Sequence, residues 1–122
     1  MKTMIHVEDS DLIVQRLSEW MVEIDPTLQI LSATSLAQAT RLLETHTPDF
    51  MVLDINLPDG NATSHVAKFK RMAPDMQIAI LSSSNDSFTR EKCLQLGADW
   101  VFDKATDLPK LIGLLTEAPT QF

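Results

Sequence analysis

Short apolar segments alternate along this chain with segments of helical periodicity, and there are five of each. This alternation is typical of repeated βα units built around a parallel sheet. The segments with the apolar character of strands are 4–7, 29–33, 50–54, 77–82 and 100–103. The middle three are almost continuously apolar, which predicts central strands with helices on both faces. The pattern therefore predicts an α/β fold, a doubly wound five-stranded parallel sheet with five helices.

Each predicted helix carries apolar residues that recur on one face. The first helix spans about 10–24 and the second about 35–46, while the fourth ends at Gly97, a natural C′ glycine. From about residue 117 to 122 we expect a loose tail. The recurring residues are Ile13, Leu17, Trp20, Met21 and Ile24 in the first helix, Leu36, Ala39, Leu42 and Leu43 in the second, Ala62, Val66 and Phe69 in the third, Phe88, Cys93 and Leu96 in the fourth, and Leu108, Leu111, Ile112 and Leu115 in the fifth.

Composition and charge narrow the class of protein. With 122 residues, 44% hydrophobic and 22% charged, the chain has the size and composition of one globular domain. The net charge of −7 and the lack of a long basic cluster argue against direct binding to nucleic acid. No apolar stretch is long enough for a signal peptide or a membrane span, so we expect no membrane association. The single cysteine, Cys93, cannot form an internal disulfide, which favours a reducing, cytoplasmic location.

Polar side chains gather where four of the predicted strands end. Glu8 and Asp9 follow the first strand, Asp54 ends the third, Ser82 ends the fourth and Lys104 follows the fifth. The carboxyl ends of parallel strands meet at one edge of the sheet, where ligands of such folds bind. The second strand contributes no comparable group, which agrees with a place at the sheet's margin.

This set of side chains suits phosphoryl chemistry on a carboxylate. Three carboxylates in one small site repel one another unless a cation is present, and hard oxygen ligands favour Mg²⁺. Lys104 adds a mobile positive charge, and Ser82 adds a hydroxyl that can donate to a phosphoryl oxygen. The sequence therefore indicates phosphoryl transfer to a carboxylate nucleophile, with charge neutralised by a metal ion and an ammonium group.

Each of these residues also has a structural interpretation of its own. Asp54 alone would be a strand-ending Asx turn, and the segment 8–10 would be the N-cap of the first helix. Residues 82–84 would be a polar turn, and Lys104 a surface lysine. Their joint occurrence at one sheet edge favours the functional interpretation, because four independent coincidences would be needed otherwise.

The pattern resembles the receiver domain of two-component response regulators, the CheY-like family with a flavodoxin-like fold. The matching motifs are Glu8-Asp9, Asp54-Ile55-Asn56-Leu57-Pro58-Asp59-Gly60, Ile80-Leu81-Ser82, Gly97-Ala98-Asp99 and Lys104. The resemblance spans essentially the whole chain, and it implies a single receiver domain over 1–122 with no output domain attached.

By this resemblance the protein takes a phosphoryl group onto Asp54 from the phosphohistidine of a histidine kinase or a histidine phosphotransfer protein. Ser82 would swing toward the phosphoryl group, and Lys104 would pair with it. Phosphorylation would switch a protein-interaction surface near the fourth helix and the fifth strand. Output would then pass to a downstream protein effector, to a self-dimer, or onward by phosphotransfer.

The resemblance also implies a Mg²⁺ site. Asp9 and Asp54 would bind the ion directly, Asn56 would offer its backbone carbonyl, and Glu8 would act through a bound water. Asn56 and Ser84 would flank the phosphoryl group and tune dephosphorylation.

Three positions depart from the family pattern. Receivers commonly have an aromatic switch residue three positions before the lysine, where this chain has Val101. The adjacent Trp100 cannot simply replace it, because successive strand residues point to opposite faces. The proline that usually follows the lysine is Ala105 here, so we expect a trans peptide and a differently shaped loop. A glycine that is frequent after the acceptor loop is replaced by Ala62.

Two other functions stay open at this point. An aspartyl-phosphate phosphatase of haloacid-dehalogenase type needs a second aspartate two residues after the nucleophile, where this chain has Asn56. An interaction module without phosphorylation is opposed by the acidic residues and favoured slightly by Val101 and Ala105. We expect no enzyme activity beyond Mg-dependent self-phosphorylation and autodephosphorylation.

Overall fold

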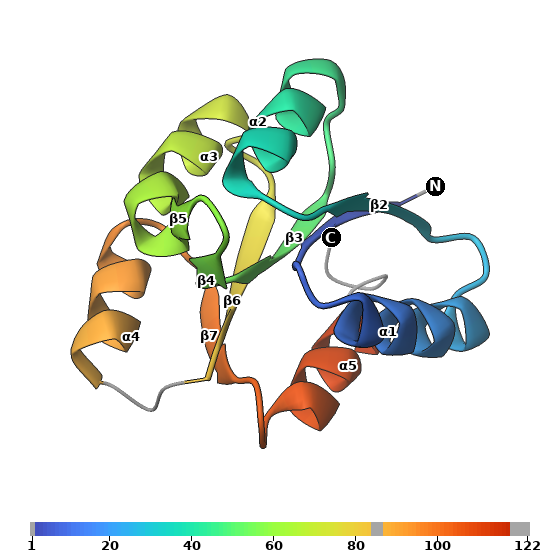
Figure 1. Ribbon diagram of the computed structural model, residues 1–122. Helices are drawn as coiled ribbons and strands as arrows, with labels where there is room; N and C mark the ends of the chain where they lie inside the picture. Colours follow the sequence, from blue (N-terminus) through green and yellow to red (C-terminus); the bar gives the residue numbers. More distant parts are fainter. Residues whose placement is uncertain (1, 84–86, 118–122) are drawn as a thin grey trace.

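The computed structural model describes residues 2–83 and 87–117 and consists of a parallel sheet between two layers of helices (Figure 1). The strands of the sheet are β1 (Thr3–Val7), β2 (Gln29–Ala33), β3 (Phe50–Asp54), β6 (Gln77–Ser82) and β7 (Trp100–Asp103). The helices are α1 (Asp11–Ile24), α2 (Leu36–Thr45), α3 (Val66–Met72), α4 (Ser87–Gln95) and α5 (Leu108–Glu117). These bounds confirm the predicted elements to within a few residues.

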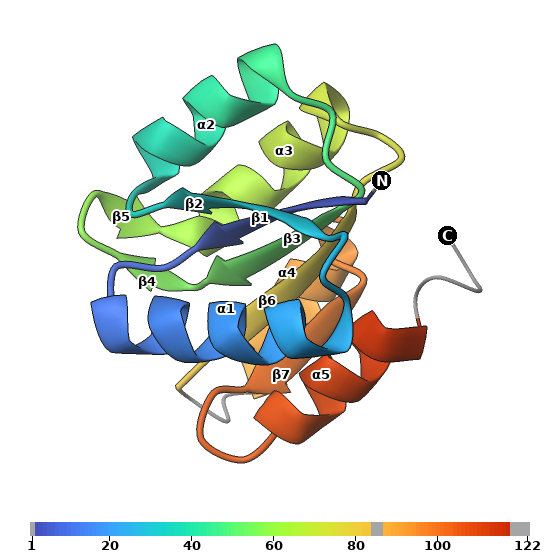
Figure 2. The same ribbon diagram turned by 90° about the vertical axis from the view of Figure 1, so that its right-hand side faces the viewer.

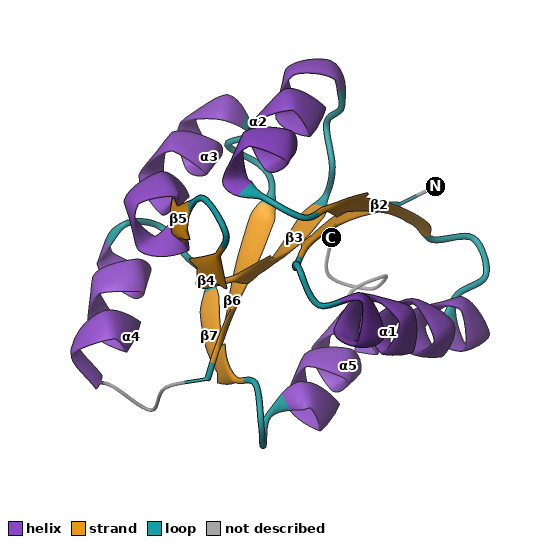
Figure 3. Cartoon of the chain, viewed as in Figure 1, coloured by secondary structure: helices purple, strands orange, loops and turns teal. Residues whose placement is uncertain are grey.

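The connection between β3 and α3 carries the structure that the sequence pattern did not predict. A short antiparallel pair, β4 (Asn56–Leu57) and β5 (Gly60–Asn61), precedes the 3-10 helix η1 (Ala62–His65) (Figure 3). The predicted third helix is therefore split into η1 and α3. The predicted tail begins at the last residue of α5, and residues 118–122 lie outside the described part of the chain.

The strands of the sheet follow the order β2-β1-β3-β6-β7, and all neighbours are parallel. The prediction that β2 is central was wrong, while its expected place at the margin is confirmed. Ile30 and Leu31 of β2 are only partly buried, and Gln29 and Ser32 are exposed. The first strand is an interior strand instead, between β2 and β3, with Met4 to Val7 all buried. The apolar content of residues 29–33 had suggested a central strand. As an edge strand, β2 has no neighbouring strand on one side, so even its apolar residues stay partly exposed to solvent.

Two hydrophobic clusters cover the two faces of the sheet, beneath the two layers of helices seen in Figure 2. One packs β-strand residues such as Ile5, Leu53 and Ile80 against α2, α3 and α4, and the other packs Val52 and Leu81 against α1 and α5. Each strand therefore divides its side chains between two helical layers, as expected for a parallel sheet buried on both faces.

Some predicted apolar stripes face solvent in part. In α1, Leu17 and Met21 are buried as expected, but Trp20 and Ile24 are 43% and 44% exposed. In α4, Cys93 is buried, whereas Phe88 is 74% exposed. These apolar residues lie on the predicted helices, but each helix buries a face that is narrower than its apolar stripe.

Gly97 ends α4 as predicted. Its φ of +117° is strained for any residue with a side chain, and an added Cβ would lie 3.1 Å from Cγ of Lys70. Within the described part of the chain, none of the helices has the length and apolar character needed to cross a membrane.

Candidate functional site

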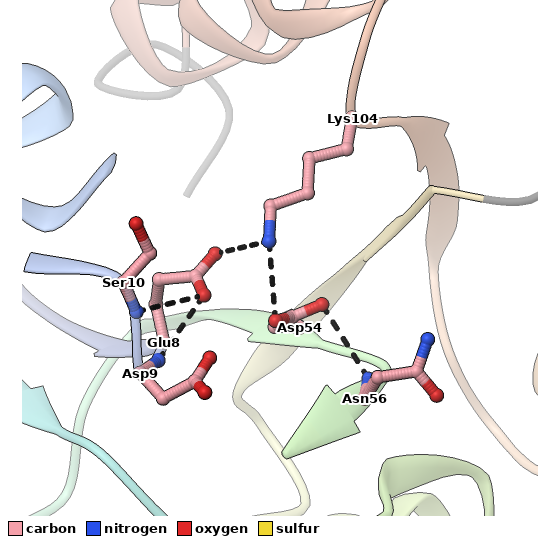
Figure 4. A network of polar contacts seen from close by, with 6 residues as sticks. All are labelled: Glu8, Asp9, Ser10, Asp54, Asn56 and Lys104. Carbon is pink, nitrogen blue, oxygen red and sulfur yellow. Dashed lines mark hydrogen bonds and ion pairs between the residues drawn. The ribbon is translucent and has the colours of Figure 1, made fainter. Parts of the chain in front are cut away.

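The strand ends bring the predicted polar residues to one edge of the sheet (Figure 4). Asp54 is the last residue of β3 and Ser82 is the last residue of β6. Glu8 directly follows β1, and Lys104 directly follows β7. The parallel register β1·β3·β6·β7 places these four ends side by side, as predicted from the sequence.

Three carboxylates form a cluster at the centre of this edge. One carboxylate oxygen from each of Glu8, Asp9 and Asp54 lies within 4.8 Å of the others. Glu8 and Asp54 are buried, and Asp9 is exposed at the mouth of the cluster. The cluster therefore combines two buried carboxylates, Glu8 and Asp54, with a third, Asp9, that reaches solvent.

Lys104 supplies the positive charge at the cluster. Its Nζ lies 2.7 Å from Oε1 of Glu8 and 3.2 Å from Oδ2 of Asp54. Burial by itself would lower the pKa of Lys104, but the hydrogen bond to Glu8 and the charge of Asp54 outweigh it and raise the pKa above its usual value. The side chain stays charged and bridges the two buried carboxylates.

Glu8 also organises the turn that leads into α1. Its Oε2 accepts hydrogen bonds from the backbone N–H groups of Asp9, at 3.1 Å, and Ser10, at 3.3 Å. Ser10 occupies the N-cap position of α1, but its side chain makes no capping hydrogen bond. The segment 8–10 is therefore held by a buried carboxylate and differs from a simple serine cap.

The loop after Asp54 is fixed at both of its ends. The backbone N–H of Asn56 donates to Oδ1 of Asp54 at 3.5 Å. Farther along, Asp59 accepts hydrogen bonds from the backbone N–H groups of Leu36, at 2.9 Å, and Ala37, at 3.0 Å, and these bonds lower its pKa. Sequence reasoning gave Asp59 no role of its own. The signal was there, since Asp59-Gly60 forms a turn and α2 needs partners for its first N–H groups.

The loop after β7 positions Lys104. The backbone N–H of Lys104 donates to the carbonyl oxygen of Ser82 at 2.8 Å, and Ser82 itself is buried. The next residue, Ala105, donates its N–H to Oδ1 of Asp103 at 2.8 Å. Proline could not make this hydrogen bond. The described residues contain no cis peptide bond, which confirms the expected trans link at Ala105. Ser84 lies outside the described residues.

Val101 and Trp100 face opposite sides of the sheet. Val101 is buried in the cluster under α2, α3 and α4. Trp100 stacks on Phe50 with ring centroids 5.7 Å apart, on the side of α1 and α5. The expectation that Trp100 cannot take the place of an aromatic residue at position 101 is confirmed.

His6 is a buried polar residue whose environment the sequence did not predict. It is 1% exposed, and neither ring nitrogen has a hydrogen-bond partner among the described residues. Burial lowers the pKa of His6 to about 4, the charge of Glu8 opposes this shift, and the charge of Lys104 adds to it. His6 is therefore a neutral residue next to the acidic cluster at neutral pH.

A doubly wound sheet with its acidic site at the carboxyl ends of the central strands defines a class of α/β domains that bind ligands at this edge. Within that class, the model of the response regulator receiver domain matches residues 4–116, so this chain belongs to that family. The resemblance stated from the motifs is confirmed. The family places the chain among the proteins of two-component signal transduction.

Known proteins show how far the similarity reaches. The DNA-binding transcriptional regulator NtrC of Rhizobium meliloti (strain 1021) is 33% identical over 70 residues, which cover 57% of this chain and 14% of that protein. The signal receiver domain of a DNA binding response regulator protein (merR) from Colwellia psychrerythraea 34H is 19% identical, with a TM-score of 0.92 over 99% of this chain and 100% of that one. The solved structures at such identities establish the fold.

A further solved structure carries a modified site. A response regulator protein from Burkholderia pseudomallei, with a phosphorylated aspartic acid, a calcium ion and citrate, is 19% identical. The comparison covers 98% of this chain and 70% of that one, with a TM-score of 0.84. The chain spans between 14% and 56% of the length of eight curated relatives.

Proposed function

We propose that the protein is a phospho-accepting switch in which Asp54 takes a phosphoryl group from the phosphohistidine of a histidine kinase or a histidine phosphotransfer protein. The observation that carries this proposal is the setting of Asp54, a buried carboxylate at a strand end with the Lys104 ammonium 3.2 Å from Oδ2. In the transfer, an oxygen of Asp54 forms a bond to phosphorus while the phosphorus–nitrogen bond of the phosphohistidine breaks. The electron pair of that bond stays on the imidazole nitrogen.

The carboxylate cluster fits a Mg²⁺ ion. It offers hard oxygen atoms within 4.8 Å of one another and carries three carboxylates against the single ammonium group of Lys104. Asp9 and Asp54 would bind the ion directly, Asn56 would bind it through its backbone carbonyl, and Glu8 through a water molecule. Bound there, Mg²⁺ would neutralise charge on the transferring phosphoryl group. The Burkholderia pseudomallei protein, with its phosphorylated aspartic acid and calcium ion, supports a divalent cation in such a site.

Three further residues shape the phosphorylated state in this proposal. Ser82 donates its hydroxyl to a phosphoryl oxygen, and Asn56 and Ser84 flank the group and set how fast it is hydrolysed. Val101 takes the position of the switch residue. Val101 is buried and has no aromatic ring that could rotate in response to phosphorylation. In this proposal the conformational change passes instead through the loops after β3 and β6.

The output of the switch is a protein contact. We place the protein in the cytoplasm, where the unpaired Cys93 stays reduced. A downstream protein effector, a second copy of the domain, or onward phosphotransfer would receive the signal. Several relatives, among them proteins named as DNA-binding regulators and methylesterases, are much longer than the part that this chain matches.

Incubation with acetyl phosphate and Mg²⁺, followed by mass spectrometry of the intact protein, tests the proposal. A phosphatase of haloacid-dehalogenase type would turn over many equivalents without retaining a group, and a non-phosphorylated interaction module would show no change. A retained phosphoryl group that Asp54→Asn abolishes supports the switch. Retention of the group in Asp54→Asn would refute it.

A further inference from the structure

A groove of about 430 Å³ lies between η1 and α4, on the side of the sheet covered by α2, α3 and α4. Thr63 and Ser64 line it from η1, Phe88 and Lys92 line it from α4, and Leu96 lines it from the turn after α4. Figure 1 shows α4 beside the segment that leads into α3. We name this feature the η1–α4 groove.

The α4 wall of the groove is built around an exposed aromatic side chain. Phe88 and Lys92 are four residues apart on α4 and so lie on one face of the helix, and Leu96 follows four residues later in the turn that ends it. Phe88 is 74% exposed, the highest value among the large hydrophobic residues that the structure describes as exposed. An exposed aromatic ring in a hollow, next to another apolar residue, is the usual form of an anchor for a partner.

The charge around the groove is opposite to that of the whole chain. The protein carries −7, but α3 and α4 together carry five basic residues and one acidic residue, Glu91. Lys70 is paired with Asp99 at 2.9 Å. The other four are exposed: Lys68, Arg71, Arg90 and Lys92. Lys92 brings positive charge into the lining of the groove, and Arg90 is a second exposed basic residue on the same helix, so the groove combines apolar residues with a basic α4 wall that attracts an acidic ligand.

The groove also connects to the acidic site through the chain itself. It lies after two segments that start at the site, one running from Asp54 to η1 and one from Ser82 to α4. The N–H of Ala62, the first residue of η1, donates to the carbonyl oxygen of Ile55 at 2.8 Å. On the other side, Oγ1 of Thr63 lies 3.6 Å from Sγ of Cys93 in α4. A change at the end of β3 can therefore reach the η1 wall of the groove and, through Thr63 and Cys93, its α4 wall.

We propose that the η1–α4 groove docks an acidic segment of a partner protein, which seats an apolar side chain against Phe88 and Leu96 and faces its carboxylates toward Lys92. As an output surface this inference rests on the proposed function. Nucleic acid fits less well, because Lys92 is the one basic residue among the groove's lining residues and the rest of that lining is neutral.

Selection from a phage-displayed library of random linear peptides tests the proposal. The full chain is presented with and without beryllofluoride, and an enriched peptide is then synthesised and its affinity measured. We expect acidic peptides with leucine or an aromatic residue, and at least about tenfold weaker binding to Phe88→Ala and to Lys92→Glu. Leu12→Ala and Arg41→Glu are the matched controls, since both residues are exposed on other helices, and these variants should bind like the parent.

Three results would overturn the proposal. The first is that no peptide is enriched in either state. The second is that an enriched peptide still binds to both Phe88→Ala and Lys92→Glu. The third is that an oligothymidylate displaces the peptide and its binding depends on Lys92. Intact-mass measurement of acetyl phosphate labelling separates the two proposals. If Asp54 accepts the phosphoryl group and no peptide binds, the docking surface alone fails. If a peptide binds through Phe88 and Asp54 is never labelled, the proposed function fails and the docking surface stands.

Discussion

The ammonium group of Lys104 lies closer to Glu8 than to Asp54, at 2.7 Å from Oε1 of Glu8 and 3.2 Å from Oδ2 of Asp54. The side chain of Glu8 is completely buried, so Lys104 compensates a carboxylate that has no access to water. The lysine therefore has a structural role in addition to its proposed pairing with the phosphoryl group. In the proposed phosphorylated state, where Lys104 would turn toward the phosphoryl group, Glu8 would need another cation, which a metal ion could supply.

Replacing Lys104 should expose this structural role. In Lys104→Met without Mg²⁺, the buried carboxylate of Glu8 loses its partner, and we expect the free energy of unfolding to fall by about 3 kcal/mol at neutral pH. Urea denaturation with EDTA measures the loss. The double variant with Glu8→Gln should recover much of the stability, because no buried charge is then left unpaired. Equal stability of Lys104→Met and the parent would contradict this role.

Removing the exposed charge of the cluster should have the opposite effect. Asp9 makes no ion pair with another described residue, and its carboxylate lies near those of Glu8 and Asp54. Asp9→Asn should stabilise the metal-free protein by up to about 1 kcal/mol and weaken Mg²⁺ binding. Asp54 differs, because Lys104 already pairs with it.

Asp11→Asn is the control for Asp9→Asn, since Asp11 is exposed in the first turn of α1 and lies outside the carboxylate cluster. It should leave Mg²⁺ affinity unchanged. Titration with Mg²⁺ monitored by tryptophan fluorescence or by calorimetry compares the two variants. Unchanged Mg²⁺ affinity in Asp9→Asn would show that Asp9 does not bind the ion.

His6 should make the stability depend on pH. Its pKa is about 4 in the folded protein and about 6.5 when unfolded, so the unfolded chain binds more protons between these values. The stability is complete above about pH 6.5 and falls as the pH drops toward 4, by roughly 3 kcal/mol in total. Glu8 and Lys104 are the charged groups that act on His6. In His6→Leu this part of the pH dependence should disappear. Denaturation at a series of pH values tests it, and parallel curves for parent and variant would refute it.

The hydrogen bond from Ala105 to Asp103 predicts the effect of restoring the family's proline. Ala105→Pro removes the N–H donor and restricts the backbone of Lys104, so we expect a loss of stability of about 1 kcal/mol. Ala105→Ser keeps the N–H and should behave like the parent. Thermal unfolding compares the variants. A more stable Ala105→Pro protein would show that the loop accepts the usual receiver geometry.

Much of the fold and of the site was predictable because both depend on local patterns. Continuous apolar runs ending in polar residues gave all five strand positions, and parallel strands then require Asp54, Ser82 and Lys104 to meet at one edge. The order of the strands depends on contacts far apart in the sequence, so β2 was wrongly expected in the centre. The exposure of Trp20 and Phe88 could not be predicted for the same reason, since it depends on how far neighbouring elements extend.

The finer features of the site depend on distances in space that the spacing of residues along the sequence does not determine. That Lys104 lies closer to Glu8 than to Asp54 is a matter of 2.7 Å against 3.2 Å, a difference set by the packing of three separate loops. The anchoring of the acceptor loop by Asp59 at the start of α2 joins segments 22 and 23 residues apart. His6 looked like an ordinary strand residue, and only burial without a hydrogen-bond partner sets it apart.

The most direct test of the central claim is the position of the phosphoryl group after treatment with acetyl phosphate. The labelled protein is digested, and the modified residue is mapped by mass spectrometry in the parent, in Asp54→Asn and in Asp75→Asn, whose exposed carboxylate precedes β6 at the other end of the sheet. We predict Mg²⁺-dependent label on Asp54 in the parent and in Asp75→Asn, and none in Asp54→Asn. Label on another residue, or equal labelling of Asp54→Asn, would contradict the account.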